Sequence, residues 1–238
     1  YYNFSKIDKE NHTFDNEVGY LPQDDILFAD LTVYECLYYS AKLRMPNLKK
    51  DDINMLIDNV LYNLNLEKDD VSSGKGSIKG LKIGSINKPG AISGGQRKRI
   101  NLAVELLSNP SVLFLDEPTS GLSSIDSEKL MDLLAHINNM GTTIVTTIHQ
   151  PSKQVFEKFD KIMILTTNGT LAYFGSVSKS LEYFESHSKL KFEKYKNPAS
   201  FVLEALETKS PEEWKLIYEN SEDYIYYIKR HLATETTK

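Results

Sequence analysis

The sequence predicts an α/β fold with a mostly parallel sheet, a helical subdomain and an added antiparallel hairpin. Short apolar runs alternate with helical stretches between residues 18 and 148, and strands that are separated by helices usually pair in parallel. Two further apolar runs, 162–165 and 171–174, flank Asn168-Gly169, a dipeptide that favours the tight turn of a hairpin.

Three short strands are expected in the parallel sheet, at residues 18–21, 112–115 and 143–148. The middle one reads Val-Leu-Phe-Leu, a continuous apolar run that is typical of a strand buried on both faces. Strands of this kind occur in parallel sheets.

Apolar residues at helical spacing predict helices over 32–43, 51–66, 93–108, 130–140 and 176–188. Asp30 or Thr32 is a candidate N-cap for the first, and Ser93 for the third. Gly141 is expected to end the fourth. The predicted helical subdomain spans about residues 30–108.

Residues 67–92 are polar and rich in glycine, and they predict a flexible surface insertion. Within them, Gly74-Lys75-Gly76-Ser77 resembles part of a phosphate-binding loop. The upstream glycine and the following hydroxyl of Gly-x-x-x-x-Gly-Lys-Ser/Thr are both missing. We therefore do not expect this segment to bind phosphate.

Composition excludes several classes of protein. A net charge of −5 argues against a nucleic acid partner. The single cysteine, Cys36, rules out an internal disulfide, fits a reducing compartment and is expected to be a buried structural thiol. No apolar run is long enough to span a membrane, and no signal peptide is visible. The first residue is Tyr1, so an excerpt or a processed product is expected.

Two acidic residues, Asp116 and Glu117, follow the central strand directly. Ligands of open α/β sheets bind at the carboxyl ends of the strands. One carboxylate there can position Mg²⁺ through water while the other orients an attacking water. A merely polar loop after the strand is the alternative interpretation.

A second candidate site is Ser93-Gly94-Gly95-Gln96, at the predicted start of a helix. Two glycines let a phosphate approach the free backbone N–H groups, where the helix dipole adds positive potential. An ordinary capped helix is the alternative.

Taken together, these segments resemble the ATP-binding cassette (ABC) ATPases. Ser93 to Arg97 resembles the family's signature motif, and the segment from Leu115 to Leu122 resembles its Walker B motif. Gln23 matches the Q-loop glutamine and His149 the switch histidine. The resemblance covers residues 17–205 and implies a P-loop NTPase-type core.

Five segments are similar to the G (White-type) subfamily of transporters. They are residues 31–35, 43–46, 96–101, 147–152 and 197–201. This resemblance implies an ATPase at the cytoplasmic face of a membrane, attached to a transmembrane domain outside the present chain.

The resemblance implies a role for each matching residue at the hydrolytic site. Glu117 would orient and deprotonate the attacking water, and Asp116 would help to hold Mg²⁺. His149 would contact the γ-phosphate. Gln23 would reach both Mg²⁺ and the water. Taken singly, Gln23 also fits a plain loop residue and His149 a structural histidine.

It also implies a dimer. Ser93, Gly94, Gly95 and Gln96 would bind the γ-phosphate of an ATP held mainly by a second cassette, with two cassettes sandwiching two nucleotides head to tail. The basic residues 97–99 of the same helix are expected to form a solvated or carboxylate-paired face rather than a catalytic one.

The chain departs from the family pattern twice. No Gly-x-x-x-x-Gly-Lys-Ser/Thr occurs in it; in the family this Walker A loop lies upstream of the Q-loop, so the isolated residues are expected to bind ATP weakly or not at all. The D-loop carries Ser123 where the family has aspartate, which predicts altered communication between two ATP sites. Asp126, three residues on, is a candidate to compensate.

These expectations divide the chain into a partial nucleotide-binding domain, 1–205, and a linker toward the transmembrane domain, 206–238. A disordered tail is the alternative for the linker. Two other functions stay open: a soluble ABC ATPase, or a cassette that dimerises or regulates without hydrolysis.

Overall fold

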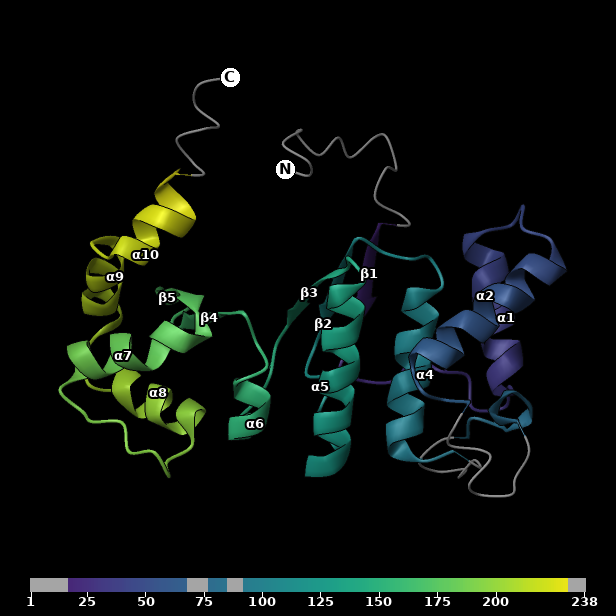
Figure 1. Ribbon diagram of the computed structural model, residues 1–238, viewed down its shortest axis with the longest axis horizontal. Coiled ribbons are helices and arrows are strands. Elements are labelled where there is room, and N and C mark those ends of the chain that lie inside the picture. Colours follow the sequence, from purple (N-terminus) through teal and green to yellow (C-terminus); the bar gives the residue numbers. More distant parts are fainter. Residues whose placement is uncertain (1–16, 68–76, 85–91, 231–238) are drawn as a thin grey trace. The chain divides into compact units, whose positions relative to one another are not determined.

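The structure is a computed structural model that describes residues 17–67, 77–84 and 92–230. The chain forms two compact units, the first ending at His149 and the second beginning at Gln150. Each unit is described below by itself (Figure 1).

The first unit contains a parallel sheet of three strands in the order β1-β2-β3. They are β1 (Val18–Leu21), β2 (Val112–Leu115) and β3 (Thr143–Thr146). Leu21 is paired with Leu115, and Leu115 with Thr146, so all three strands end in the same row. The three predicted strands are confirmed, and β2 is the central one.

Helices α4 (Gly94–Leu106) and α5 (Ser124–Asn139) contact β1 and β3 respectively and each other. Leu113 and Leu115 of β2 are buried. The other face carries a row of paired residues, Tyr20, Phe114 and Val145. Phe114 is 42% exposed, so the prediction that the central strand is buried on both faces is wrong among the described residues, where α4 and α5 pack on one face.

The helical subdomain adds α1 (Val33–Arg44), α2 (Lys50–Asn63) and the short 3₁₀ helix η1 (Ile78–Gly80). Thr32, not Asp30, caps α1, through a capping box with Glu35. Cys36 is buried as expected, and burial raises the pKa of its thiol.

One part of the expected surface insertion belongs to the core instead. Ile78 and Ile83 are 1% and 0% exposed, because these apolar side chains gain free energy by leaving water. Residues 74–76 of the glycine-lysine segment lie outside the described residues.

The second unit is built on an antiparallel hairpin of β4 (Lys161–Leu165) and β5 (Leu171–Ser176). Gly169 in the turn has a φ of +80°, a conformation that glycine adopts without strain. The helices of this unit are α6 (Lys153–Phe156), α7 (Val177–Ser188), α8 (Pro198–Leu206), α9 (Pro211–Glu219), α10 (Glu222–Tyr224) and the π-helical turn η2 (Ile225–Lys229).

An aromatic core joins the hairpin to these helices. Its buried members include Tyr173, Phe184, Phe201, Trp214 and Tyr218. The stretch after residue 205 is therefore helical and packed as far as the start of η2, and its service as a linker stays a prediction. Among the described residues, no helix has the length and apolar character needed to cross a membrane.

Candidate functional site

Polar side chains gather where the three parallel strands of the first unit end. Gln23 follows β1, Asp116 and Glu117 follow β2 directly, and Thr147 follows β3. The ladder continues one step beyond the strands, because the Asp116 N–H donates to the Leu21 carbonyl at 2.8 Å and the Thr147 N–H to the Leu115 carbonyl at 3.0 Å. This pairing fixes the three strand ends side by side.

Hydrogen bonds connect these side chains to one another. The Gln23 amide Nε2 donates to Glu117 Oε2 at 3.0 Å. The Thr147 hydroxyl donates to Asp116 Oδ1 at 2.6 Å and accepts the Glu117 backbone N–H at 3.0 Å. The structure thus brings together Gln23, Asp116 and Glu117, three of the residues that the sequence singled out.

Thr147 was not among the predicted site residues. Its hydroxyl is the only side-chain group among the described residues that touches both Asp116 and Glu117. The register of the parallel strands is the signal that could have identified Thr147. A threonine just beyond a strand that pairs in parallel with β2 must lie beside the residues just beyond β2.

The backbone of Glu117 has a φ of +44°, in the left-handed region. A non-glycine residue there costs about 1–3 kcal/mol, and such strain concentrates at functional sites. The Thr147 hydroxyl holds the Glu117 N–H, and the Glu117 carbonyl accepts from the Ser120 N–H at 3.0 Å. The turn that presents the Glu117 carboxylate is therefore held from both sides.

His149 lies apart from this cluster. It is exposed, and it makes no hydrogen bond to Gln23, Asp116 or Glu117 within the described part of the chain. The next residue, Gln150, has a φ of +44°, so the chain turns sharply directly after the histidine.

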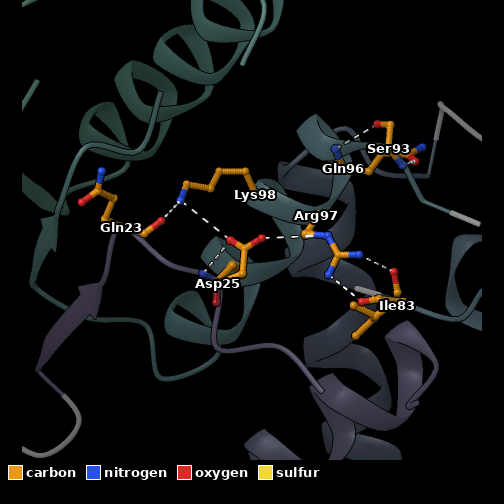
Figure 2. Close-up of polar contacts among 9 residues, drawn as sticks. Gln23, Asp25, Ile83, Ser93, Gln96, Arg97 and Lys98 are labelled. Carbon is orange, nitrogen blue, oxygen red and sulfur yellow. Dashed lines mark hydrogen bonds and ion pairs between the residues drawn. The ribbon is translucent and has the colours of Figure 1, made fainter. Parts of the chain in front are cut away.

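The predicted phosphate-binding helix start is formed by α4. Ser93 caps it, with the Gln96 N–H donating to Ser93 Oγ at 3.2 Å and the Ser93 N–H donating to Gln96 Oε1 at 2.9 Å (Figure 2). Ser93 is exposed, and apart from the immediate neighbours of Gly94 in α4 no atom of the described residues lies within 4 Å of the position that a Gly94 side chain would take. As far as the described residues show, the helix start is open to an approaching group, while the Gln96 side chain serves the cap.

Gly95 and the start of α5 lie side by side. A Cβ on Gly95 would lie 3.5 Å from Cγ of Asp126. Ser123 caps α5, its hydroxyl donating to Asp126 Oδ2 at 2.7 Å and accepting the Asp126 N–H at 3.1 Å. Asp126 was the candidate to compensate for Ser123. It is hydrogen-bonded to Ser123 itself.

The basic residues of α4 do not form a solvated face. Lys98 is buried, and its ammonium donates to the Gln23 carbonyl at 2.7 Å and lies 3.7 Å from Asp25 Oδ1. Arg97 donates to the carbonyls of Ile83 and Gly84, both at 2.7 Å (Figure 2). Of the two alternatives stated for these residues, carboxylate and carbonyl pairing is the one observed.

The donor set at the strand ends fits Mg²⁺. Asp116 uses one carboxylate oxygen for Thr147, and Gln23 uses its amide nitrogen for Glu117, so an oxygen of each remains for a hard cation. No group of three or more His, Cys, Asp or Glu residues that could hold a metal is found among the described residues. Mg²⁺ is commonly bound by one or two carboxylates together with substrate phosphates.

Comparison with known proteins gives consistent matches. The family described as ABC transporter matches residues 2–120, and the family described as ABC-2 type transporter matches residues 149–221. The chain is 41% identical over 224 residues to ABC transporter G family member 30 of Arabidopsis thaliana. It is 40% identical over 189 residues to the broad substrate specificity ATP-binding cassette transporter ABCG2 of Mus musculus.

These alignments cover 91% and 79% of this chain but only 15% and 27% of the two relatives. Among solved structures, cbiO1 from Clostridium perfringens, part of the ABC transporter complex cbiONQ, superposes with a TM-score of 0.56 at 25% identity. That match covers 79% of this chain and 67% of the other. The α/β architecture expected from the sequence is confirmed.

Proposed function

This chain belongs to the ABC transporter family, in its G-type branch, and on that premise we propose that it is the ATP-binding and ATP-hydrolysing engine of a membrane transporter. The observation that carries the proposal is the contact of Gln23 with Glu117 beside Asp116, at the carboxyl edge of the parallel sheet. Ligands of open α/β sheets bind at that edge.

Glu117 is the proposed general base for the water that attacks the γ-phosphate. Gln23 holds one of its carboxylate oxygens at 3.0 Å, which leaves Oε1 to accept a proton from water. The strained backbone turn and its two hydrogen bonds fix where that oxygen lies. Preorganisation of this kind reduces the reorganisation needed in the transition state.

Asp116 and Gln23 would hold Mg²⁺ through the oxygen atoms that their other hydrogen bonds leave available. When bound, the ion neutralises charge that develops on the phosphate oxygens. Thr147 orients the Asp116 carboxylate from the neighbouring strand.

His149 is proposed to contact the γ-phosphate of bound ATP. Its exposure fits a ligand-facing side chain, since no described residue satisfies its imidazole. Apo geometry does not rule out a group whose partner arrives with the substrate.

A second cassette is the proposed partner in a head-to-tail dimer. The exposed start of α4 at Ser93, Gly94 and Gly95 would bind the γ-phosphate of an ATP held mainly by that partner. Ser123 and Asp126 lie next to Gly95, so the proposed D-loop and signature surfaces are one surface of the cassette. A transmembrane domain of the same transporter would place the engine at the cytoplasmic face of a membrane.

Residues 1–238 on their own are proposed to bind ATP weakly. They contain no Gly-x-x-x-x-Gly-Lys-Ser/Thr, and such a loop supplies backbone N–H groups and a lysine for the phosphates. Equilibrium dialysis tests this. Micromolar affinity for ATP in residues 1–238 would contradict it.

The proposed function is tested by ATP hydrolysis in the complete transporter with and without Glu117→Gln. The variant keeps the shape of the side chain but not its basicity, so kcat should fall by about a hundredfold or more while ATP still binds. Glu128→Gln on α5 is the matched control and should keep its rate. A rate unchanged by Glu117→Gln would contradict the assignment, and a wild-type transporter without hydrolysis would instead favour the regulatory cassette.

A further inference from the structure

The loop that carries Gln23 is fastened to helix α4 by a compact ionic cluster. Asp25, two residues after Gln23, has its carboxylate 3.7 Å from the Lys98 ammonium and 3.9 Å from Arg97 Nε. Asn101, one turn further along α4, donates its amide to Asp25 Oδ1 at 3.3 Å. Figure 2 shows Asp25 between Lys98 and Arg97, with the Gln23 carbonyl bonded to the same lysine.

Burial makes this cluster costly to open. The Lys98 side chain is only 7% exposed, and the side chains of Arg97 and Asp25 are 19% and 27% exposed. A buried ammonium that loses its partners keeps its desolvation penalty. The loop and the helix are therefore expected to move as one body rather than to separate.

Helix α4 connects this cluster to the open helix start. Lys98 follows the Ser93 cap by five residues, which is about 7.5 Å of helix at 1.5 Å per residue. One rigid helix thus carries both features. Its start at Ser93 is exposed, and little more than a turn later Lys98 donates to the Gln23 carbonyl. A displacement of the helix start must be transmitted to Gln23.

Gln23 in turn touches the hydrolytic carboxylate. Its amide is 3.0 Å from Glu117 Oε2, and a shift of about an ångström at such a contact can cost up to a hundredfold in rate. Among the described residues, the hydrogen bonds and ion pairs of the Asp25 side chain all come from α4, namely from Arg97, Lys98 and Asn101.

We propose that Asp25 and Lys98 form a latch that positions Gln23 and couples the start of α4 to hydrolysis at the strand edge of the same cassette. They are positioning residues that act through Gln23 and do not touch the reacting atoms. This inference rests on the proposed function of Glu117. It adds a route of communication within one cassette. A group bound at Ser93, at the start of α4, would change the position of Gln23 and so the rate at the cassette's own hydrolytic site.

The latch is tested by kinetics of the complete transporter bearing Lys98→Met, Asp25→Asn or both. Each single change removes one charge at nearly constant volume, and kcat should fall about tenfold while the KM for MgATP stays within about twofold. The double variant should be no slower than the slower single variant, because both changes break the same contact.

Glu105→Gln is the matched control. Glu105 is a buried carboxylate on α4 that pairs with Arg44 at 2.6 Å and accepts the Tyr20 N–H of β1 at 3.2 Å, an acceptor role that the glutamine oxygen can keep. Among the described residues it has no hydrogen bond or ion pair with Gln23 or Asp25. It should lower thermal stability yet keep kcat within about twofold. Single variants that slow kcat no more than Glu105→Gln does, or that add their effects in the double variant, would overturn the latch.

Hydrogen exchange separates this inference from the function on which it rests. In the complete transporter, Lys98→Met should speed amide exchange at Leu31, whose N–H donates to the Phe28 carbonyl at 3.2 Å further along the same loop, while the β2 amides stay protected. Unchanged exchange there would refute the latch even in an active transporter. A wild-type transporter that hydrolyses no ATP would refute the proposed function, and the exchange result would still decide the latch.

Discussion

The strand edge of the first unit and the aromatic core of the second unit use side chains in opposite ways. At the strand edge, half-buried or exposed polar groups bond to one another around a strained residue, Glu117. In the aromatic core, Trp214 and Phe184 are fully buried with ring centroids 5.2 Å apart. One region holds carboxylate groups in position at a cost in free energy, and the other supplies stability.

The difference extends to how polar atoms are satisfied. The buried tyrosine hydroxyls described in the second unit each donate to a backbone carbonyl, as Tyr183 does to Ala172 at 3.0 Å and Tyr218 to Phe174 at 2.9 Å. At the strand edge, side chains bond to side chains and leave carboxylate oxygens available. Unused acceptors beside a strained backbone are what a ligand site needs and a core avoids.

The largest effect is expected from Trp214→Ala in the aromatic core. Trp214 is 0% exposed and donates its indole N–H to the Leu206 carbonyl at 2.9 Å. Removing it should lower the free energy of unfolding by about 3–5 kcal/mol. Urea denaturation measures this. Leu216→Ala on the same helix, where Leu216 is 60% exposed, is the control and should cost little.

Alkaline pH should weaken the aromatic core next. Burial, followed by the nearby negative charge of Asp223, raises the pKa of Tyr218 to about 12. An unfolded tyrosine titrates near ~10, so the native state resists ionisation. This stability is fully present below pH ~10 and is lost as pH rises toward ~12. Burial raises the pKa of Tyr173 and Tyr183 in the same direction.

The measurement is the free energy of unfolding from pH 8 to 12, in wild type and in Tyr218→Phe. The variant removes one titrating phenol, so its stability should fall less steeply with pH. If the free energy of unfolding fell equally steeply with pH in the two proteins, ionisation of Tyr218 would not be the cause of the loss.

At the strand edge, the Thr147 hydroxyl is expected to contribute to the rate of hydrolysis. Thr147→Val keeps the shape but removes the hydroxyl that joins Asp116 to the Glu117 N–H. We expect kcat of the complete transporter to fall about tenfold, since one lost positioning bond is worth roughly 1–2 kcal/mol. Thr147→Ser keeps the hydroxyl and should restore most of the rate. If both variants behaved alike, the bridge would have no part in catalysis.

Secondary structure was predictable because it follows from local pattern. Apolar spacing placed α1, α2 and α4 to within a few residues, and Asn168-Gly169 located the hairpin turn. Exposure was less predictable. Phe114 belongs to an apolar run, but the run does not say which of its faces a helix covers.

The site was predictable only as separate segments. Asp116 and Glu117 were identified from their places after a strand and Gln23 from its resemblance to the Q-loop, whereas their hydrogen bonds join segments that are 31 to 94 residues apart and depend on the register between strands. For Lys98 the sequence left a solvated face and a carboxylate-paired face both open, because charge pattern alone does not reveal the partner. Asp25 lies beside Lys98 because of the path that the loop after β1 takes. Such pairings are tertiary and carry no local signal.

The smallest expected effect concerns Ser123, where the strand edge and the partner cassette are proposed to communicate. Ser123→Asp would introduce a carboxylate against Asp126, which the serine hydroxyl now holds at 2.7 Å. The new repulsion should release Asp126 from its place beside Gly95 and change the ATPase rate of the complete transporter by about twofold. Ser123→Thr keeps the hydroxyl and the N-cap, so it should leave the rate alone. A rate that stays the same in Ser123→Asp would remove Ser123 from any account of how two ATP sites communicate, and Asp126 would then be a structural cap and nothing more.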